Sequence, residues 1–198
     1  MKKIVLVMSV LLMSALTYAQ TATQVLDKSA AILSAKSGVK ADFKATMAQG
    51  TISGTIAVKG NKFMATTRHT KVWFDGKTQW TYLTKNDEVN VSNPKDSELQ
   101  SLNPYNFINM YKQGYKSNMS KNATSYIVHL TATSKTKQVQ EMFITVNKKT
   151  YAPSQVKMLQ GKKWVTFDVS NLKQEKLTDS AFRFNAKDFP SAEIIDLR

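Results

Sequence analysis

The stretch Thr70–Val91 constrains the fold of this sequence more than any other, because it holds two short apolar-rich runs separated by a turn dipeptide. The runs are Lys71–Phe74 and Thr78–Leu83. Asp75 and Gly76 lie between them, and this dipeptide favours a type I′ turn because both central residues of that turn take positive φ. The stretch therefore predicts a β-hairpin with a two-residue turn.

The predicted hairpin concentrates aromatic side chains on one of its faces. A two-residue turn places Trp73 across from Thr78. Since successive side chains of a strand alternate between faces, Trp73 then shares a face with Trp80 and Tyr82. A polar turn leads on into Glu88–Ser92, which extends the hairpin to a three-stranded meander.

Alternation of apolar and polar residues predicts further strands on both sides of this meander. In residues 39–48, Phe43 and Met47 belong to the apolar set, so this strand has one dry face and one wet face. The alternation returns at 52–58, 125–133, 141–146, 154–159 and 164–169, and a strand at 62–68 follows a Gly-Asn turn. The connections between the last four strands are short and polar, which predicts an antiparallel meander.

Two helices are predicted between these strands. Thr23–Lys36 carries an apolar stripe that needs a sheet to cover. Asn103–Lys112 has Asn103 as a good cap and an apolar stripe of Phe107, Ile108 and Tyr111. This second helix is either a plug for the open side of the sheet or a movable lid.

The segment from Gly54 to the aromatic hairpin resembles the LolA family, the periplasmic carriers of outer-membrane lipoproteins. In that family a G-x-[LI]-x-V-[KR] strand and a following Phe lead to a D-G-x-x-x-W-x-Y hairpin. The matching residues here are Gly54, Ile56, Val58, Lys59, Phe63, Asp75, Gly76, Trp80 and Tyr82.

The end of the chain resembles the same family. Its members end in an F-x-F strand, a proline turn and a last apolar strand, which here correspond to Phe182–Phe184, a turn at Pro190 and Ile194–Leu197. Residues 185–191 depart from the Pro-Pro-Lys-Gly type of turn that is more usual in the family.

The first 19 residues have the pattern of a secretory signal. Lys2 and Lys3 precede the apolar run Ile4–Leu16, and the small-residue end of the pattern finishes at Ala19. Cleavage there would leave residues 20–198 as one domain, which we expect in the bacterial periplasm. With 0 Cys the chain has no disulfide, thiolate site or lipidation cysteine.

The formal net charge of +14 attracts anionic partners, namely nucleic acid, an anionic membrane surface or an acidic protein. Export disfavours nucleic acid. In the predicted meander the connections alternate between the two ends of the sheet, so four lysines should lie at one end and form a basic rim, unless they are simply solvated hairpin tips. These are Lys135, Lys137, Lys162 and Lys163.

Catalytic residue patterns are scarce in this sequence. The two histidines, His69 and His129, lie in separate predicted strands with no acidic residue at a telling spacing. No phosphate-binding loop and no metal-ligand cluster occurs, so we expect neither an enzyme nor a cofactor.

The apolar content suits either an ordinary packed core or a lipid cavity. With 9 Met, 9 Phe, 7 Tyr and 3 Trp, a curved sheet could supply a concave apolar face. Methionine adapts to ligands of variable shape such as acyl chains. The residues predicted for the cavity and its lid are Phe43, Met47, Ile56, Phe63, Trp80, Tyr82, Phe107, Ile108, Tyr111, Met142, Ile144 and Met158.

The resemblance favours the cavity, because family members shelter the lipid anchor of a lipoprotein in an incomplete barrel capped by helices. It implies as partners acylated lipoproteins, an inner-membrane lipoprotein-releasing ABC transporter and an outer-membrane acceptor. In the family a basic residue, usually Arg, latches the helical lid, and Lys59 matches that place here. Lys lacks the planar, multi-donor fork of Arg.

The sequence thus predicts an α+β single domain, a curved and mostly antiparallel sheet forming an unclosed β-barrel with helices on its concave side. The function that follows is a monomeric, non-enzymatic carrier of lipoprotein acyl chains. The alternative is a sensor or interaction module of the same fold, with a closed apolar core and a basic rim that docks an acidic partner.

Overall fold

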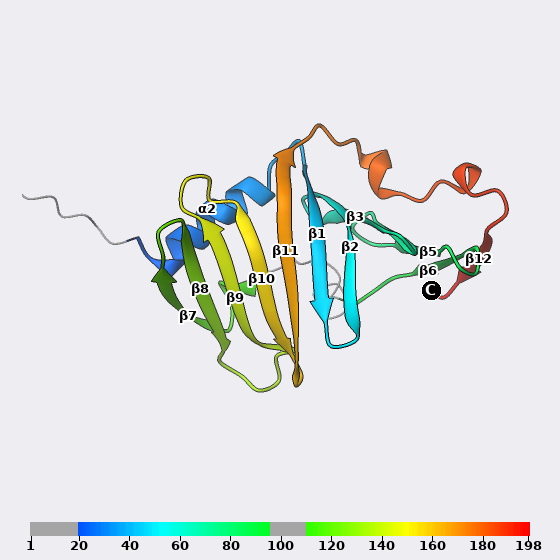
Figure 1. The fold of residues 1–198 in the computed structure, drawn as a ribbon. Helices are drawn as coiled ribbons and strands as arrows, with labels where there is room; N and C mark the ends of the chain where they lie inside the picture. The colour runs from blue at the N-terminus through cyan, green and yellow to red at the C-terminus, as the bar shows by residue number, and fades with distance from the viewer. Residues whose placement is uncertain (1–19, 96–109) are drawn as a thin grey trace, which may run out of the picture.

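Residues 20–95 and 110–198 are described by a computed structural model, in which one sheet of 12 strands carries the helix α2 (Ala22–Leu33) on one side (Figure 1). The strand order is β12-β6-β5-β4-β3-β2-β1-β11-β10-β9-β8-β7, and the two edge strands do not pair with each other. Every neighbouring pair is antiparallel except β12 with β6. The predicted fold, an unclosed and mostly antiparallel sheet, is therefore confirmed.

The strands follow the predicted alternation closely, although their ends differ by a few residues. The predicted signal, residues 1–19, and residues 103–109 of the predicted second helix lie outside the described residues. The bounds are β1 Val39–Met47, β2 Gly50–Lys59, β3 Lys62–Thr67, β4 Thr70–Phe74, β5 Gln79–Leu83, β6 Glu88–Ser92, β7 Tyr115–Lys121, β8 Ser125–Ala132, β9 Val139–Asn147, β10 Pro153–Gln160, β11 Lys163–Gln174 and β12 Glu193–Asp196.

The helix α2 spans Ala22–Leu33 and begins with a capping box. The Thr21 side chain accepts a hydrogen bond from the Gln24 backbone N–H, and the Gln24 side chain accepts one from the Thr21 N–H. Its buried stripe includes Val25 and Leu33, as the sequence predicts. Within residues 20–95 and 110–198, no helix combines the length and the hydrophobicity that spanning a bilayer requires.

The strand register divides the sheet into two faces. The inner face is the side on which α2 lies, and there Val128, Ile144 and Val156 stand side by side on β8, β9 and β10. These three side chains belong to the same buried cluster as Val25 and Leu26 of α2. The opposite side is the outer face, and the sheet bends around the side that holds the helix (Figure 1).

A second group of buried side chains lies on the outer face of β4 and β6. Trp73, Val89 and Val91 are buried, as is Phe182, but none of them belongs to the inner cluster. The C-terminal segment, defined here as residues 175–192, contributes Phe182 and packs the rings of Phe184 and Phe189 on Trp73. It contains the short 3₁₀-helices η2 (Asp179–Phe182) and η3 (Ala186–Asp188). The molecule therefore has two apolar cores, one on each side of the sheet.

The register of the aromatic hairpin differs from the prediction. Trp73 lies opposite Trp80, not Thr78, because the connection has four residues, Asp75–Thr78. The Asp75 carboxylate accepts hydrogen bonds from the backbone N–H groups of Lys77 and Thr78, at 3.1 and 3.0 Å, and only Gly76 in this turn has positive φ. Since the register shifts by two residues, Trp73 still shares a face with Trp80.

The predicted strand at Phe182–Phe184 is wrong. Phe182 ends the 3₁₀-helix η2, and Phe184 lies in the irregular part of the C-terminal segment. Phe182 is buried against the outer face, so its neighbours cross the sheet instead of joining it as a strand. The predicted last strand is confirmed as β12, which pairs with β6 in parallel.

Gly54 allows β2 and β3 to approach each other closely on the inner face. A Cβ at this position would lie 2.0 Å from the carbonyl oxygen of Thr66 and 3.1 Å from the Cε1 atom of Phe43. Phe43 is the residue opposite Gly54 on β1, so its ring occupies the space that a side chain would need.

We predict that Gly54→Ala lowers the free energy of unfolding by at least about 2 kcal/mol, because backbone atoms of β3 must move to admit the methyl group. Urea denaturation followed by circular dichroism measures the change. Gly161→Asn is the control, since Gly161 has φ +60 in open space, where Asn costs little. Equal stabilities of the two variants would contradict this account of Gly54.

Candidate functional site

The inner face is the candidate binding surface, and α2 closes part of it. Over β8 to β10 the side chains are packed under the helix, and three of the predicted cavity residues are found there. Met142, Ile144 and Met158 are at most 2% exposed and belong to the cluster that includes α2. These three side chains are closed to solvent.

The part of the inner face on β1 to β4 is less completely covered. Phe43 and Met47 on β1 and Val72 on β4 are half-buried, and Ile52 on β2 is 45% exposed. The register places Ile52 opposite Ala45, a member of the inner cluster, so its exposed side chain continues the inner face. These residues form an apolar surface that borders the packed core.

The remaining predicted cavity residues are divided between the two faces. Ile56 and Phe63 are fully buried in the inner cluster. Trp80 and Tyr82 lie on the outer face. The side chains of Phe63, Phe74 and Gln79 are in register on the inner face, so that of Trp80, the next residue, points to the opposite side. Phe107 and Ile108 lie outside the described residues.

Tyr111 connects the end of the predicted lid segment to α2. Its buried hydroxyl donates a hydrogen bond to the Asp27 carboxylate, and Lys112 Nζ lies 2.9 Å from the same carboxylate. Burial and the Asp27 hydrogen bond raise the pKa of Tyr111 to about 12. The hydrogen bonds from Tyr111 and Lys112 hold the pKa of Asp27 below its usual value.

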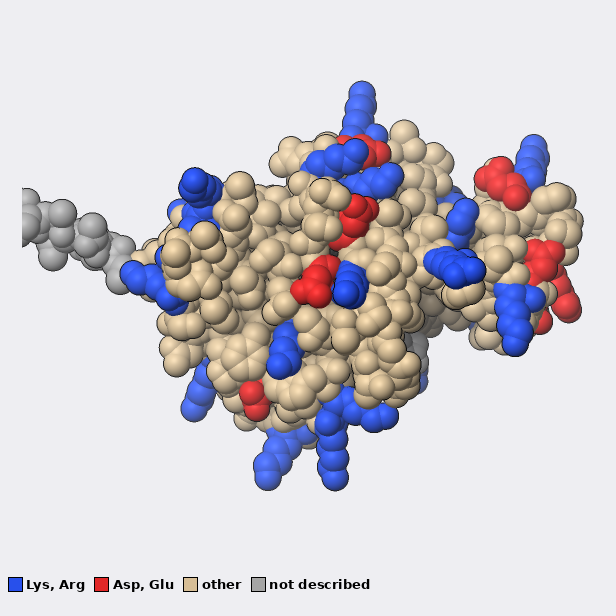
Figure 2. Space-filling view, viewed as in Figure 1, with Lys and Arg blue, Asp and Glu red and all other residues tan. Residues whose placement is uncertain are grey.

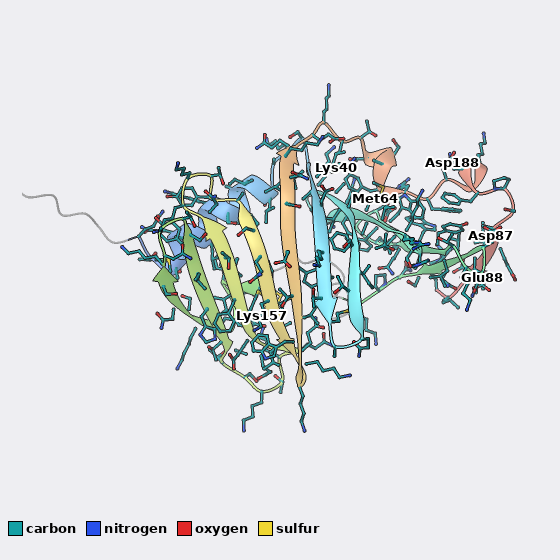
Figure 3. All side chains as sticks on the ribbon, viewed as in Figure 1. Lys40, Met64, Asp87, Glu88, Lys157 and Asp188 are labelled. Carbon is teal, nitrogen blue, oxygen red and sulfur yellow. The ribbon has the colours of Figure 1, made fainter. Side chains whose placement is uncertain are left out.

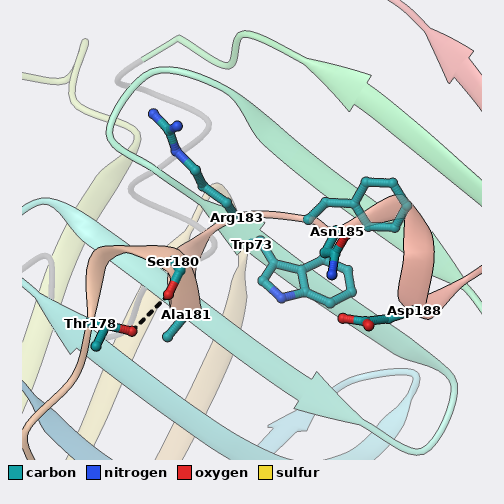
Figure 4. A pocket seen from close by; sticks show the side chains of 8 residues that line it. Trp73, Thr178, Ser180, Ala181, Arg183, Asn185 and Asp188 are labelled. Atoms are coloured by element: carbon teal, nitrogen blue, oxygen red, sulfur yellow. Dashed lines mark hydrogen bonds between the residues drawn. The ribbon is translucent and has the colours of Figure 1, made fainter.

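The outer face has a groove of about 490 Å³ beneath the C-terminal segment (Figure 4). Its floor includes the Trp73 indole, which contacts the rings of Phe184 and Phe189 at centroid distances of 5.7 and 5.6 Å. Phe189 also packs on Tyr82 at 4.6 Å. The aromatic face that the sequence predicts for the hairpin is thus covered by the protein's own C-terminal segment.

Lys59, the predicted lid latch, holds this C-terminal segment. Its Nζ donates hydrogen bonds to the Leu177 carbonyl at 2.8 Å and to the Asp179 carboxylate at 3.1 Å, and Lys62 Nζ lies 2.7 Å from the other Asp179 oxygen. Hydrogen bonds from Lys62 and Lys59 lower the pKa of Asp179. A role of Lys59 toward residues 103–109 stays a prediction.

The four lysines of the predicted basic rim are exposed, and their connections lie at the same end of the sheet. Lys135 and Lys137 lie between β8 and β9, and Lys162 and Lys163 lie at the junction of β10 and β11. The function of this rim stays a prediction.

The two histidines lie in different surroundings. His69 is exposed in the β3–β4 turn, and His129 Nε2 lies 3.2 Å from the Glu141 carboxylate on the outer face. Residues 20–95 and 110–198 contain no group of three potential metal ligands.

Sequence reasoning missed the exposure of Ile52 and the covering of the hairpin by the C-terminal segment. The alternation indicates the face on which Ile52 lies, but its exposure depends on which distant parts of the chain pack over that face. The apolar residues on both faces of β4 could have indicated a second cover.

Comparison with known proteins gives a family and a fold. Residues 13–162 match the family described as outer membrane lipoprotein carrier protein LolA. No curated protein matches the sequence significantly. An uncharacterised conserved protein from Thermus thermophilus superposes with a TM-score of 0.61 at 14% identity, covering 89% of this chain and 99% of that one.

Two further solved structures superpose with lower TM-scores. A LolA superfamily protein from Nitrosomonas europaea has a TM-score of 0.46 at 14% identity, covering 84% of this chain and 99% of its own. The lipoprotein LppX from Mycobacterium tuberculosis has a TM-score of 0.45 at 10% identity, covering 80% and 99%.

We predict that one tyrosine ionises near pH 12 in the folded protein and that Tyr111→Phe removes this transition. Because the phenol's pKa is raised, its contribution to stability is complete below its unfolded pKa of 10.0 and is lost as the pH rises through about 12. Ultraviolet titration of the two proteins measures the difference. In Asp27→Asn the transition should move to lower pH, and an unchanged value would contradict the assigned hydrogen bond.

We predict that Phe182→Ala lowers the free energy of unfolding by about 3–5 kcal/mol, because this fully buried ring fills the core on the outer face. Guanidinium denaturation monitored by tryptophan fluorescence measures the loss. Phe184→Ala is the matched control, since Phe184 is only half-buried and should cost less. A larger loss for Phe184 would mean that the outer core is wrongly assigned.

Proposed function

Because the chain belongs to the family of outer membrane lipoprotein carriers, we propose that it binds the acyl chains of lipoproteins on its inner face, as a carrier and not as an enzyme. The observation that carries this proposal is the partly open apolar surface on β1 to β4. Phe43, Met47 and Val72 are half-buried there, and Ile52 is 45% exposed.

The physical need for such a carrier follows from the hydrophobic effect. Each methylene of an acyl chain that is kept from water contributes about 0.8 kcal/mol, so a lipid anchor does not cross an aqueous compartment unaided. Release into water would cost the same free energy. Transfer therefore goes to a second apolar site, reached by direct contact.

The proposed cavity extends from the open part of the inner face toward the packed part. An acyl chain would first contact Met47 and Ile52, and it would continue along Phe43 toward Ile56 and Phe63. Deeper entry, as far as Met142, Ile144 and Met158, requires displacement of α2. Flexible methionine side chains suit a surface that repacks around variable chains.

The proposed setting is the periplasm, reached through a signal peptide at residues 1–19 that is cleaved after Ala19. There the protein, as a monomer, would receive lipoproteins from an inner-membrane lipoprotein-releasing ABC transporter and pass them to an outer-membrane acceptor. The match to the carrier family supports this route.

The opening of the proposed carrier would differ from the opening of family members in which Arg latches the lid. Lys59 engages the C-terminal segment through Leu177 and Asp179. Tyr111, near the end of the predicted lid helix, contacts α2 through its hydrogen bond to Asp27. We therefore propose that Tyr111 is part of the mechanism by which the inner face opens.

The alternative function is a non-enzymatic interaction module whose inner face stays shut. The observation that favours it is the dense packing under α2, where Val128, Leu130, Met142 and Ile144 are fully buried. Such a protein would bind no acyl chain.

Displacement of a fluorescent acyl probe tests the proposal. We expect a triacylated lipopeptide to displace the probe from the chain beginning at Gln20, and its unacylated counterpart to leave the probe bound. Ile52→Asp and Met47→Asp should each weaken probe binding at least about tenfold, because a carboxylate is costly in an apolar site.

The matched control is Ile127→Asp, a change of the same kind on the outer face of β8. It should bind the probe like the unaltered protein. Absence of probe binding by the unaltered protein would favour the closed module, and equal losses in Ile52→Asp and Ile127→Asp would remove the inner face as the site. Trp80→Asp should abolish probe binding if Trp80 lines the cavity, and unchanged binding in the folded variant would count against this assignment.

A further inference from the structure

The basic rim, Lys135, Lys137, Lys162 and Lys163, lies on two connections that are close together in the sheet. One connection joins β8 to β9 and the other joins β10 to β11. Because β9 pairs with β10, the two connections are neighbours at this end of the sheet. Figure 2 shows Lys and Arg side chains projecting from the lower edge of the molecule, where these connections lie in Figure 1. The four side chains are exposed.

Acidic side chains that could neutralise the rim are few in this half of the sheet. Between Tyr115 and Gln174 the sequence has ten lysines and two acidic residues, Glu141, which pairs with His129, and Asp168, which accepts a hydrogen bond from Gln155. Among the described residues, no ion pair involves a rim lysine. Asp87, Glu88 and Asp188 lie at the far end of the molecule (Figure 3).

An exposed tryptophan adjoins the rim. Trp164 follows Lys163 at the start of β11, and it is 36% exposed on the outer face. Lys157 Nζ lies 4.6 Å from the centre of its ring, and Phe143 packs beside it at 5.9 Å. A large amphipathic ring bordered by lysine ammonium groups is the combination that suits the headgroup layer of a bilayer.

We propose that the basic rim and Trp164 together form a docking surface for the anionic headgroups of a phospholipid bilayer. Lysines on hairpin tips can reach the surface potential of an anionic leaflet, which extends about one Debye length, roughly 8–10 Å, into solution. Trp164 would enter the headgroup layer. An acidic protein could also pair with the lysines, but a single indole bordered by lysine ammonium groups on hairpin tips is the arrangement that suits a headgroup layer.

This docking surface goes beyond the binding of acyl chains. The rim lies on the hairpin tips and Trp164 on the outer face, whereas the proposed cavity lies on the inner face. A protein with a closed inner face would still dock, and a carrier without the rim would still bind acyl chains. The two proposals can therefore fail separately.

The test is co-sedimentation of the chain beginning at Gln20 with vesicles of phosphatidylcholine, with and without phosphatidylglycerol. We expect binding only where phosphatidylglycerol is present, weakening as salt is added. Replacing the four rim lysines by Gln should lower the affinity about tenfold or more. Trp164→Phe should abolish the blue shift of tryptophan fluorescence that accompanies binding.

The control removes the same charge from the opposite end of the sheet. Lys36, Lys121, Lys149 and Lys176 are exposed at that end, and their replacement by Gln should leave most of the binding intact. Equal losses in both quadruple variants would overturn the proposal in favour of a general charge effect. Failure of the unaltered protein to bind anionic vesicles would also overturn it and leave an acidic protein as the partner of the rim.

Discussion

The pairing of β1 with β11 is the interaction on which the rest of the structure depends. It joins Val39 to Gln174 and Thr46 to Thr166, residues that are far apart in the sequence. Every other antiparallel pair in the sheet connects strands that follow each other along the chain. Without the β1–β11 ladder, the strands β1 to β6 with β12 and the strands β7 to β11 would form two separate sheets, and β1 and β11 would become open edges. Closing a loop of this length costs conformational entropy that local hairpins avoid, so we infer that this ladder forms after the two meanders.

Joining the two meanders also creates the difference between the two parts of the inner face. The helix α2 precedes β1 directly, yet it packs against β7 and β8 on the other side of the ladder. Val25, Leu26 and Leu33 therefore fill the inner face of the second meander, while the face of the first meander keeps half-buried side chains such as Phe43 and Val72. Among residues 20–95 and 110–198, α2 is the helix that packs on the inner face, and its contacts are with β7 and β8 on the far side of the ladder from β1 to β4.

Strands and their faces could be predicted from the sequence because a period of two residues is a local property. The alternation in residues 39–48 and 125–133 placed Phe43, Val128 and Leu130 on the correct side of their strands. The predicted register of the hairpin was wrong. The Asp75 side chain accepts hydrogen bonds from two backbone N–H groups and so stabilises a four-residue turn. The Asp-Gly dipeptide alone does not distinguish this turn from a two-residue turn. The error of two residues preserved the face of every side chain.

The predicted set of cavity residues includes side chains from both cores, and the reason is different. Strand β4 is apolar on both faces, with Phe74 turned to the inner cluster and Trp73 to the outer one, so alternation cannot decide which face holds a ligand. The cover over Trp73 comes from Phe184 and Phe189, more than 100 residues later, and it is held by Asp179 between Lys59 and Lys62. Such a contact leaves no periodic signal in the sequence. The C-terminal segment thus covers part of the aromatic outer face, whereas on the inner face of the first meander Phe43 and Val72 stay half-buried.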